Sequence, residues 1–471
     1  MGSPVSAPGI GQAARKPALR RLGSALAGLF IALLLLAIAL ILWPAAGAPL
    51  PTPGRDLVIA NVRVVDVERG LAGLSTSVTI RGGVITAIGP PAAGHALPVI
   101  DGGGGYLVPG FWDMHMHSFQ LSPQLHLPLF LANGVTSVRD MMDCPGERDS
   151  LIACLADKKQ WTAKAEAGRL ASPRFVSIAS YYFEDPALTP AEASARAGAY
   201  AARGLDELKV YNRLSRPAYF RVAAEARRSG MRLTGHLPKA VALEEALASG
   251  HRSFEHAHVL VRHCFARSED WRAGRLEHMP PTRLARFMVL GHDRDRCRRT
   301  YEALRRSGAW LVPTHVTREE DARAGDPAFL QDSRLAYLDP LSRWAFRDDL
   351  AGTRAEYPGR EGEEALGRYF RLGLRLTGEA HRAGVPILVG TDTALGGFRY
   401  HDEMAHLVRA GLSPAAVLRA ATLDAARFAG LESSAGSVTV GKRADLVLLD
   451  SNPLENIANT RRIRLVLLAG R

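Results

Sequence analysis

The chain has 471 residues, of which 47% are hydrophobic and 23% charged, and its formal net charge is +12 at pH 7. Such a composition excludes disordered and fibrous proteins. The basic residues are mostly arginines that alternate with acids, and no aromatic residues punctuate a basic stripe, so we expect no nucleic-acid partner. The length exceeds what one hydrophobic core usually holds, although a (β/α)8 barrel can pass about 250 residues as one domain.

The N-terminal part contains an uncharged apolar run, "LGSALAGLFIALLLLAIALILW", over residues 22–43. About 20 apolar residues suffice for a transmembrane helix, and the basic residues before the run favour a cytoplasmic N-terminus. We therefore predict a basic tail over 1–21, a transmembrane anchor over 22–43 and a linker over 44–56. The rest of the chain is then exported to the periplasmic or extracellular side. The alternative is secretion after signal cleavage near "AGA", residues 46–48.

Four cysteines occur in the chain, and in an exported protein we expect them to be paired. Three connectivities are possible for four cysteines. The sequence positions favour Cys144 with Cys154 and Cys264 with Cys297, because each of these pairs closes a short loop. None of the four has the C-x-x-C spacing of a structural zinc site.

Short runs that alternate apolar and polar residues occur near both ends of the chain that follows the linker, at 57–105 and at 430–471. Such runs predict antiparallel strands, and we expect the two segments to form one composite β-sandwich domain. Between them, over 106–429, strand and helix patterns alternate, which predicts parallel strands joined by crossover helices. The expected fold class is thus α/β, a (β/α)8 TIM barrel with a small β-sandwich.

Eight candidate strands can be assigned to the barrel, at 106–117, 134–141, 174–180, 207–212, 232–237, 253–259, 310–316 and 386–393. Active sites of such barrels lie at the C-terminal ends of the strands. Six potential metal ligands stand at these ends: His115, His117, Lys209, His236, His256 and Asp392. Side chains two apart on a strand share a face, so His115 and His117 suit one metal ion. Alone that pair is weak evidence and equally fits two surface histidines, but the six together predict a metal centre.

A resemblance that runs from about Leu57 to Arg471 is carried by the motifs "VPGFWDMHMH", "ELKVYN", "TGHL", "FEHAH", "VGTDT" and "GKRADLVLLDSNP". Together they resemble the amidohydrolase superfamily, and within it the prolidase-like (Xaa-Pro dipeptidase-like) group of binuclear metal-dependent hydrolases. The resemblance implies that CO2 carboxylates Lys209 and that the carbamate bridges two divalent ions, usually zinc. It further implies that His115, His117 and Asp392 hold the more buried ion, and His236 and His256 the more exposed one.

The chemistry of these side chains agrees with the resemblance. Zinc accepts imidazole and carboxylate ligands, and two ions ~3.5–4 Å apart can activate a bridging hydroxide. Asp392 would then act as general base and afterwards as general acid. Tyr211, two residues after Lys209, is a candidate donor to the developing oxyanion, and His315 after the seventh strand is a second catalytic candidate. Arg139 and His401 are candidates for binding a substrate carboxylate, with structural roles as the alternative.

The function that these features predict is hydrolysis of an amide bond in a dipeptide or N-acyl amino acid. Lys209 argues against the mononuclear deaminase branch of the superfamily, which lacks a bridging carbamate. A cyclic amide or lactone hydrolase with the same binuclear site is one alternative, and a non-enzymatic exported binding protein is another. We expect the substrate preference to depend on the inserts at 142–172, 262–308 and 317–345.

Overall fold

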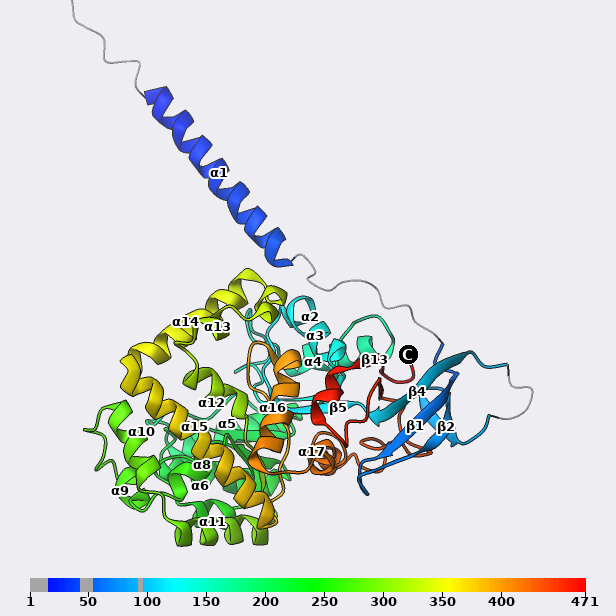
Figure 1. Ribbon diagram of the computed structural model, residues 1–471. Helices are drawn as coiled ribbons and strands as arrows, with labels where there is room; N and C mark the ends of the chain where they lie inside the picture. Colours follow the sequence, from blue (N-terminus) through cyan, green and yellow to red (C-terminus); the bar gives the residue numbers. More distant parts are fainter. Residues whose placement is uncertain (1–15, 43–53, 92–95) are drawn as a thin grey trace, which may run out of the picture.

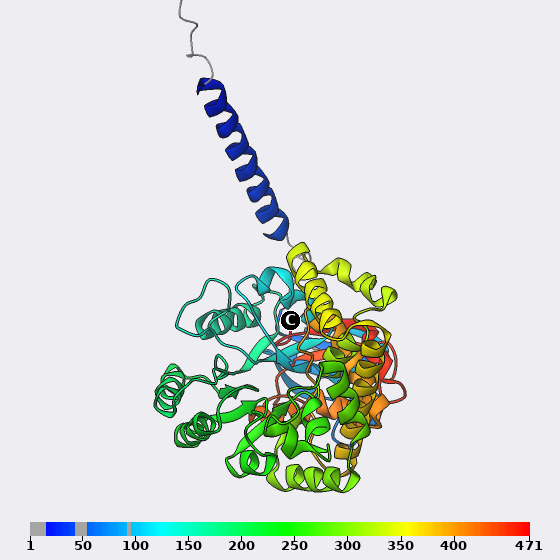
Figure 2. The ribbon, with the colours of Figure 1, turned by 90° about the vertical axis from the view of Figure 1, so that its left-hand side faces the viewer.

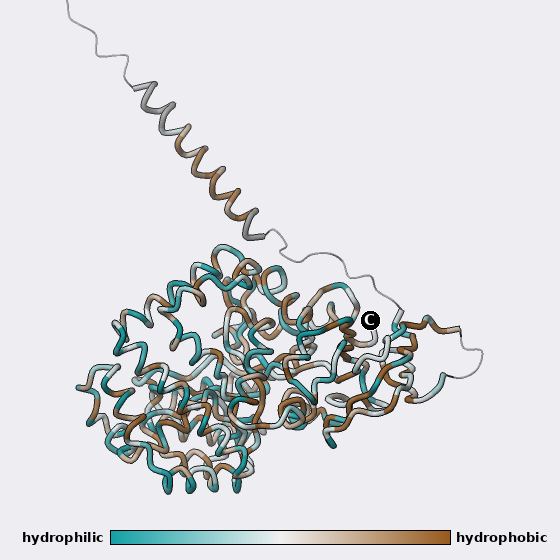
Figure 3. Tube along the Cα trace, viewed as in Figure 1, coloured by the Kyte–Doolittle hydropathy of each residue, from teal (hydrophilic) through white to brown (hydrophobic). Residues whose placement is uncertain are grey.

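The computed structural model describes residues 16–42, 54–91 and 96–471, and for the first helix it describes side chains over 23–39 only. The helix α1 (Lys16–Leu42) stands apart from the remaining elements (Figure 1), and its middle is hydrophobic (Figure 3). Among the described residues, no helix combines the length and apolarity needed to cross a membrane. The anchor predicted for 22–43, and the membrane partner it implied, are therefore not found.

Two other N-terminal predictions lie mostly outside the described residues. The structure describes the predicted basic tail only from residue 16, and the predicted linker only from residue 54.

The two ends of the described body meet in one sheet, which has six strands in the order β13-β12-β4-β1-β2-β3. The strands are β1 (Leu57–Asp66), β2 (Leu71–Arg81), β3 (Val84–Ile88), β4 (Val99–Pro109), β12 (Leu446–Leu449) and β13 (Ile463–Leu467). Figure 1 shows β1, β2 and β4 beside the barrel, next to the C-terminus. Because β4 pairs with β1 along one edge and with β12 along the other, the described strands form one continuous sheet. The expected sandwich of two sheets is not formed.

The barrel contains seven parallel strands in two sheets. They are β5 (Phe111–Met116), β6 (Val135–Asp140), β7 (Arg174–Ile178), β8 (Glu207–Val210), β9 (Arg232–Gly235), β10 (His251–Glu255) and β11 (Trp310–Val312). A bridge between Ala179 and Glu207 joins the two sheets. Helices surround these strands (Figure 2), so the predicted TIM-barrel-like fold is confirmed.

The eighth predicted strand, 386–393, is not a regular strand, although its chain closes the barrel. Ile387 forms a bridge with Leu311, and the amide of Met114 donates to the carbonyl of Val389 at 2.8 Å. The segment passes very close to its neighbours at Gly390, where a Cβ atom would lie 2.6 Å from Val312 and 2.9 Å from the Cβ of His115. A side chain at this position would clash with both neighbours, so glycine is required there.

The helices lie mainly around the barrel and over its inserts. Those of the first half are α2 (Ser122–Leu125), α3 (Leu127–Ala132), α4 (Leu155–Glu166), α5 (Pro190–Arg203), α6 (Arg216–Ser229), α7 (Leu243–Ala248), α8 (His258–His263) and α9 (Ser268–Arg272). The others are α10 (Pro281–Leu290), α11 (Arg294–Ser307), α12 (His315–Ala322), α13 (Pro327–Leu330), α14 (Pro340–Glu356), α15 (Gly359–Arg382), α16 (Gly396–Ala410), α17 (Pro414–Ala420) and α18 (Leu423–Ala429). Two 3-10 helices, η1 (Ser333–Tyr337) and η2 (Ile457–Arg461), complete the set.

Helix limits follow local capping chemistry. The α6 helix begins after Ser215, whose side chain accepts from the amide of Ala218, and it ends at Gly230 in a left-handed conformation. The same capping ends α5 at Gly204. In Figure 3 hydrophilic and hydrophobic residues alternate along the barrel helices, as is typical of helices that bury one face.

Both favoured disulfides are present. Cys144 is bonded to Cys154 and Cys264 to Cys297, and the described residues contain no free cysteine. The first bond lies in the insert after β6, and the second joins the end of α8 to α11. Both predicted pairs are therefore confirmed.

Candidate metal centre

The six predicted ligands stand at the C-terminal ends of five chain segments of the barrel. His115 is in β5 with His117 just after it, and Lys209 is in β8. His236 and His256 each follow directly on a strand, β9 and β10, and Asp392 follows the irregular eighth segment. In parallel strands these ends meet on one rim, which places the side chains around a common point.

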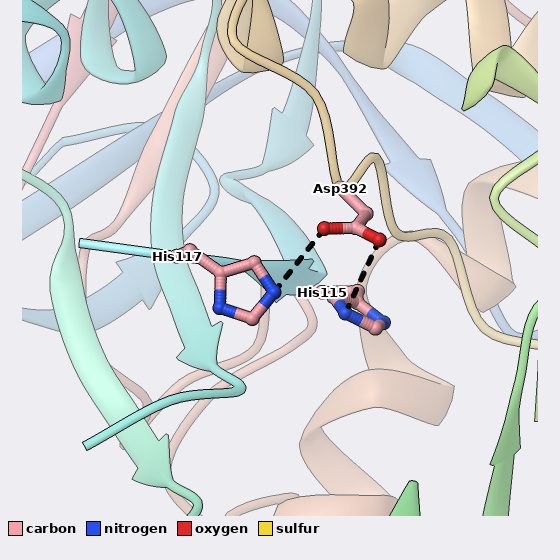
Figure 4. A group of neighbouring side chains, drawn as sticks. All are labelled: His115, His117 and Asp392. Carbon is pink, nitrogen blue, oxygen red and sulfur yellow. Dashed lines mark ion pairs between the residues drawn. The ribbon is translucent and has the colours of Figure 1, made fainter. Parts of the chain in front are cut away.

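His115, His117 and Asp392 form a compact group (Figure 4) in which one ligand atom of each lies within 4.8 Å of the others. The Nε2 atom of His117 lies 3.2 Å from one carboxylate oxygen of Asp392, and Nε2 of His115 lies 3.6 Å from the other. Burial raises the pKa of Asp392, but the neighbouring imidazoles of His115, His117 and His256 outweigh it and hold the pKa well below its ordinary value. The carboxyl is therefore ionised and offers oxygens to a cation.

His236 and His256 face the same point from the next two strands. Their Nε2 atoms lie 2.9 Å apart, and Nε2 of His256 lies 3.6 Å from Asp392. Burial lowers the pKa of His256 to about 3 and that of His236 well below its ordinary value, so both rings are neutral at pH 7. Since Nδ1 of His256 is bonded to the hydroxyl of Thr314 at 2.6 Å, its Nε2 is the atom directed at the site.

Lys209 is 2% exposed and its ammonium forms no ion pair among the described residues. Burial lowers its pKa to about 8, although the charges of Asp392, Glu255 and Asp140 act in the opposite direction. A buried lysine without a carboxylate partner is costly to keep charged. Part of the Lys209 population is therefore a neutral, nucleophilic amine near neutral pH.

A second layer of side chains, which the sequence interpretation missed, fixes the ligands. Glu255 accepts from Nδ1 of His115 at 2.9 Å, which leaves Nε2 of that ring to face the site. The other oxygen of Glu255 accepts from Arg139 at 3.0 Å and from Ser253 at 2.6 Å. A carboxylate behind a histidine ligand is typical of metal centres. The signal in the sequence was the acid in "FEHAH", directly before His256.

Arg139 does not contact a substrate site, and its predicted role in substrate binding is wrong. The side chain is 0% exposed, and all five of its N–H groups are directed at acceptors. Nε and one N–H of Nη2 donate to Glu207, and the second N–H of Nη2 donates to Ser253. Nη1 donates to Glu255 and to the carbonyl of Met114. Arg139 therefore positions Glu255, and through it His115.

His401 is also misassigned as a substrate residue. It is 3% exposed on α16, its Nδ1 lies 3.0 Å from the hydroxyl of Thr460, and its ring meets the edge of Phe111 at 6.0 Å between centroids. Phe111 begins β5, at the opposite end of the strand from His115. His401 consequently lies away from the C-terminal rim.

His315 does not join the ligand group either. The predicted strand 310–316 ends at Val312, and His315 is instead the first residue of α12. The side chain is 0% exposed beside Phe370, and neither ring nitrogen has a hydrogen-bond partner among the described residues. No described interaction joins this ring to the ligand group, so the predicted catalytic role has no support from the structure.

Tyr211 does reach the site. Its ring stacks on that of His236 at 3.8 Å between centroids, and Nζ of Lys209 lies 5.8 Å from its centre. Burial, together with the charge of Asp392, raises the pKa of Tyr211 to about 12. The hydroxyl therefore keeps its proton at neutral pH and remains a hydrogen-bond donor.

Backbone strain is concentrated at the centre. Five non-glycine residues of the described chain have positive φ, and three of them are His256, Thr314 and Asp392. Such conformations cost free energy and persist where the surrounding structure imposes them, commonly at functional sites. Gly235, before His236, shows how closely the strands approach, since a Cβ atom there would lie 2.3 Å from the carbonyl oxygen of Val210.

The residues present fit a pair of divalent ions. Nε2 of His115, which faces the site, is buried and has no hydrogen-bond partner among the described residues. Buried polar atoms without a partner commonly mark an ion or water that they bind. Neutral imidazoles and an ionised carboxylate are ligands that suit zinc and related metals.

Sequence comparison places the chain in a known family. The model of the Amidohydrolase family matches residues 212–471, more than half of the chain. The adenine deaminase of Mesorhizobium japonicum is 46% identical over 65 residues, which is 13% of this chain and 11% of that protein. The chain thus matches only a small part of this relative's length.

Solved structures share the fold over most of the chain. The bottromycin amidohydrolase superposes with a TM-score of 0.64 at 23% identity, covering 92% of this chain and 89% of the other. A Xaa-Pro dipeptidase with bound methionine superposes with a TM-score of 0.61 at 18% identity, covering 88% and 98%. The chain therefore belongs to the amidohydrolase family, and its fold is that of the prolidase-like members.

Proposed function

We propose that the protein is a metal-dependent hydrolase of an amide bond in a dipeptide or N-acyl amino acid. The observation that carries the proposal is the convergence of His115, His117 and Asp392 with His236 and His256 at one rim, next to the buried Lys209. The Xaa-Pro dipeptidase and the bottromycin amidohydrolase share the fold, which supports amide chemistry. Divalent ions, when bound by these residues, would polarise a carbonyl group and acidify a water molecule.

Lys209 completes the donor set in this proposal. Its neutral amine attacks CO2, a nitrogen–carbon bond forms and a proton leaves to solvent, so that a cation is replaced by an anionic carbamate. The pKa of about 8 supports this step, because it leaves part of the amine unprotonated near neutral pH. His115, His117 and Asp392 would hold one ion, His236 and His256 the other, and the carbamate both.

Asp392 and Tyr211 perform the proton transfers and the polar contacts. The ionised carboxylate of Asp392 accepts the proton of the attacking water and returns it to the leaving amine. Tyr211, which keeps its proton because of its raised pKa, donates a hydrogen bond to the carbonyl oxygen as negative charge develops. Glu255 and Thr314 hold His115 and His256 in the required ring orientation.

The two disulfides support a location in an oxidising compartment. We propose on this basis that the barrel acts outside the cytoplasm. Retention of both bonds in protein isolated under thiol-blocking conditions would support this location, and free thiols in that preparation would contradict it.

The test of the proposed function is metal content per chain, measured by elemental analysis of the full chain and of Lys209→Ala. We expect two ions in the parent, at most one in Lys209→Ala, and two in the control Lys239→Ala, whose ammonium pairs with Glu277 outside the ligand group. In parallel, a library of dipeptides, N-acyl amino acids, cyclic amides and lactones is assayed. A single ion in both the parent and Lys209→Ala would contradict the proposed pair of ions. Hydrolysis of cyclic amides or lactones alone would contradict the proposed substrate class.

A further inference from the structure

A cavity of about 520 Å³ lies next to the metal centre and is lined by helices α8, α9, α10, α12, α14 and α15. His258 lines it, and the ring of His258 lies 5.2 Å from that of His256 and 5.6 Å from that of His236. One side chain therefore separates the cavity from two of the candidate ligands. Its volume is within the range of pockets that hold small molecules.

The cavity carries an uncompensated positive charge. Arg262 and Arg318 both line it, and Asp321 pairs with Arg318 at 2.7 Å. Arg262 forms no ion pair among the described residues. Its guanidinium bonds to the hydroxyl of Tyr369 and lies 5.1 Å from the centre of the Trp271 ring.

The remaining acids of the cavity do not neutralise Arg262. Glu277 forms an ion pair with Lys239, and Glu356 is exposed to solvent. Burial and the neighbouring charge of Arg318 lower the pKa of Arg262. A cation without a partner in a partly desolvated cavity favours binding of an anion, because the anion replaces the hydration that burial removed.

One part of the wall is apolar. It includes Met279, Leu284, Met288 and Phe370, all of which line the same cavity. Methionine side chains adapt to irregular shapes, and an aromatic ring offers a large flat contact. The cavity thus combines a single cationic position with a wall that suits a large apolar group.

We propose that Arg262, assisted by Arg318, binds the free carboxylate of the substrate, and that Met279, Met288 and Phe370 accommodate a large apolar side chain next to it. The preferred substrate is then a dipeptide or N-acyl amino acid whose terminal residue has a free carboxylate and a large apolar side chain. The identification of the ligand as a substrate rests on the proposed function. The carboxylate-binding site itself does not require that an amide bond is cut.

The experiment measures binding of 3-phenylpropionate and of its neutral amide, 3-phenylpropanamide, to the metal-loaded full chain by calorimetry. We expect the acid to bind about 30-fold more tightly than the amide or better, since truncating one partner of a desolvated charge pair costs at least that much. Arg262→Met should lose this preference, and Arg262→Lys should retain part of it. The control Arg267→Met removes an exposed arginine paired with Asp270 and should retain all of it.

The outcomes separate this inference from the proposed function. Equal binding of acid and amide to the parent would overturn the inference, as would a preference that survives in Arg262→Met with unchanged metal content, because the ions would then hold the carboxylate. A preference that depends on Arg262, in a protein that hydrolyses no amide, would support the carboxylate site and overturn the hydrolase. If Arg262→Met loses both its metal and the preference for the acid, Arg262→Lys decides the question. An Arg262→Lys protein that keeps its metal but shows no preference for the acid would overturn the inference.

Discussion

The ligand group and the neighbouring cavity are built in two different ways. The ligands come from the ends of short barrel strands, and buried partners such as Glu255 and Thr314 hold their rings in place. The cavity is formed mainly by side chains of helices, such as Met288 on α10, together with Met279 in the segment before that helix. Strand ends fix atoms precisely, whereas helical inserts can change without disturbing the barrel. The chemistry is therefore expected to depend on the first region and the substrate on the second.

The first region also contains backbone strain and a buried network of charges. His256, Thr314 and Asp392 have positive φ values, and Arg139 with Glu207 and Glu255 forms a charged group at 0–1% exposure behind the ligands. The free energy that this arrangement costs is offset by the packing of the barrel, which makes single changes there severe.

The largest effect is expected for Asp392→Asn. The amide has nearly the same shape but accepts no proton, so general base and acid catalysis are lost, and kcat/KM should fall by about 10²–10⁴-fold. The measurement is steady-state kinetics on the best substrate of the library, with metal content determined on the same sample. Substitution in the cavity is expected to act differently, by changing substrate preference.

A control for this prediction is Asp402→Asn, which changes an acid of α16 that pairs with Arg334 and Arg399. That variant should retain most of the activity. If Asp392→Asn kept near-parental kcat/KM with both ions bound, the proton-transfer role of Asp392 would be untenable.

The next effect concerns the charged group behind the ligands. Arg139→Met leaves Glu255 buried without its cation and leaves Glu207 with Arg232 alone, and the free energy of unfolding should fall by about 3–5 kcal/mol. Urea denaturation measures this change. Arg213→Met is the matched control, because Arg213 is 69% exposed in its pair with Glu184 and an exposed pair contributes about 0–1 kcal/mol. Equal losses in the two variants would mean that Arg139 has no special role in stability.

The ligand group could be predicted from the sequence because each member follows a strand pattern, and strand ends in a barrel meet. His115 and His117 share a face by the alternation of a strand, and Lys209 stands out as one of seven lysines. The two disulfides were likewise accessible, since short loops favour their pairs. These inferences use local spacing only.

Other features depend on contacts between distant segments, which no local pattern contains. The eighth segment requires glycine at 390 because two neighbours lie within 3 Å of where its Cβ would be. Arg139 has the same sequence signature whether it is buried or faces a substrate, and three acceptors from other strands decide the outcome. The cavity beside Arg262 combines side chains of six helices, so its charge could not be inferred from any one of them.

The smallest of the three effects compares the two ends of one strand. His256 follows β10 at the metal centre, whereas His251 begins β10 at the other end. His251 is 2% exposed, its Nδ1 lies 3.2 Å from the hydroxyl of Tyr219 and its Nε2 lies 3.0 Å from the carbonyl of Ser253. Burial lowers its pKa to about 4 from the ordinary 6.5.

This lowered pKa makes stability depend on pH in a defined direction. Between pH 6.5 and 4 the unfolded chain binds a proton at residue 251 that the folded protein does not. The free energy of unfolding therefore decreases as the pH is lowered through this range, by up to about 3 kcal/mol. His251→Asn should be less stable than the parent at pH 7 because it loses buried contacts, and the difference should shrink as the pH falls to 4. Urea denaturation of metal-free protein measures it, with the exposed His278→Asn as control. A difference that stays constant with pH would show that His251 titrates alike in the folded and unfolded chain, and the acid sensitivity of the barrel would then have to come from histidines nearer to the metal centre.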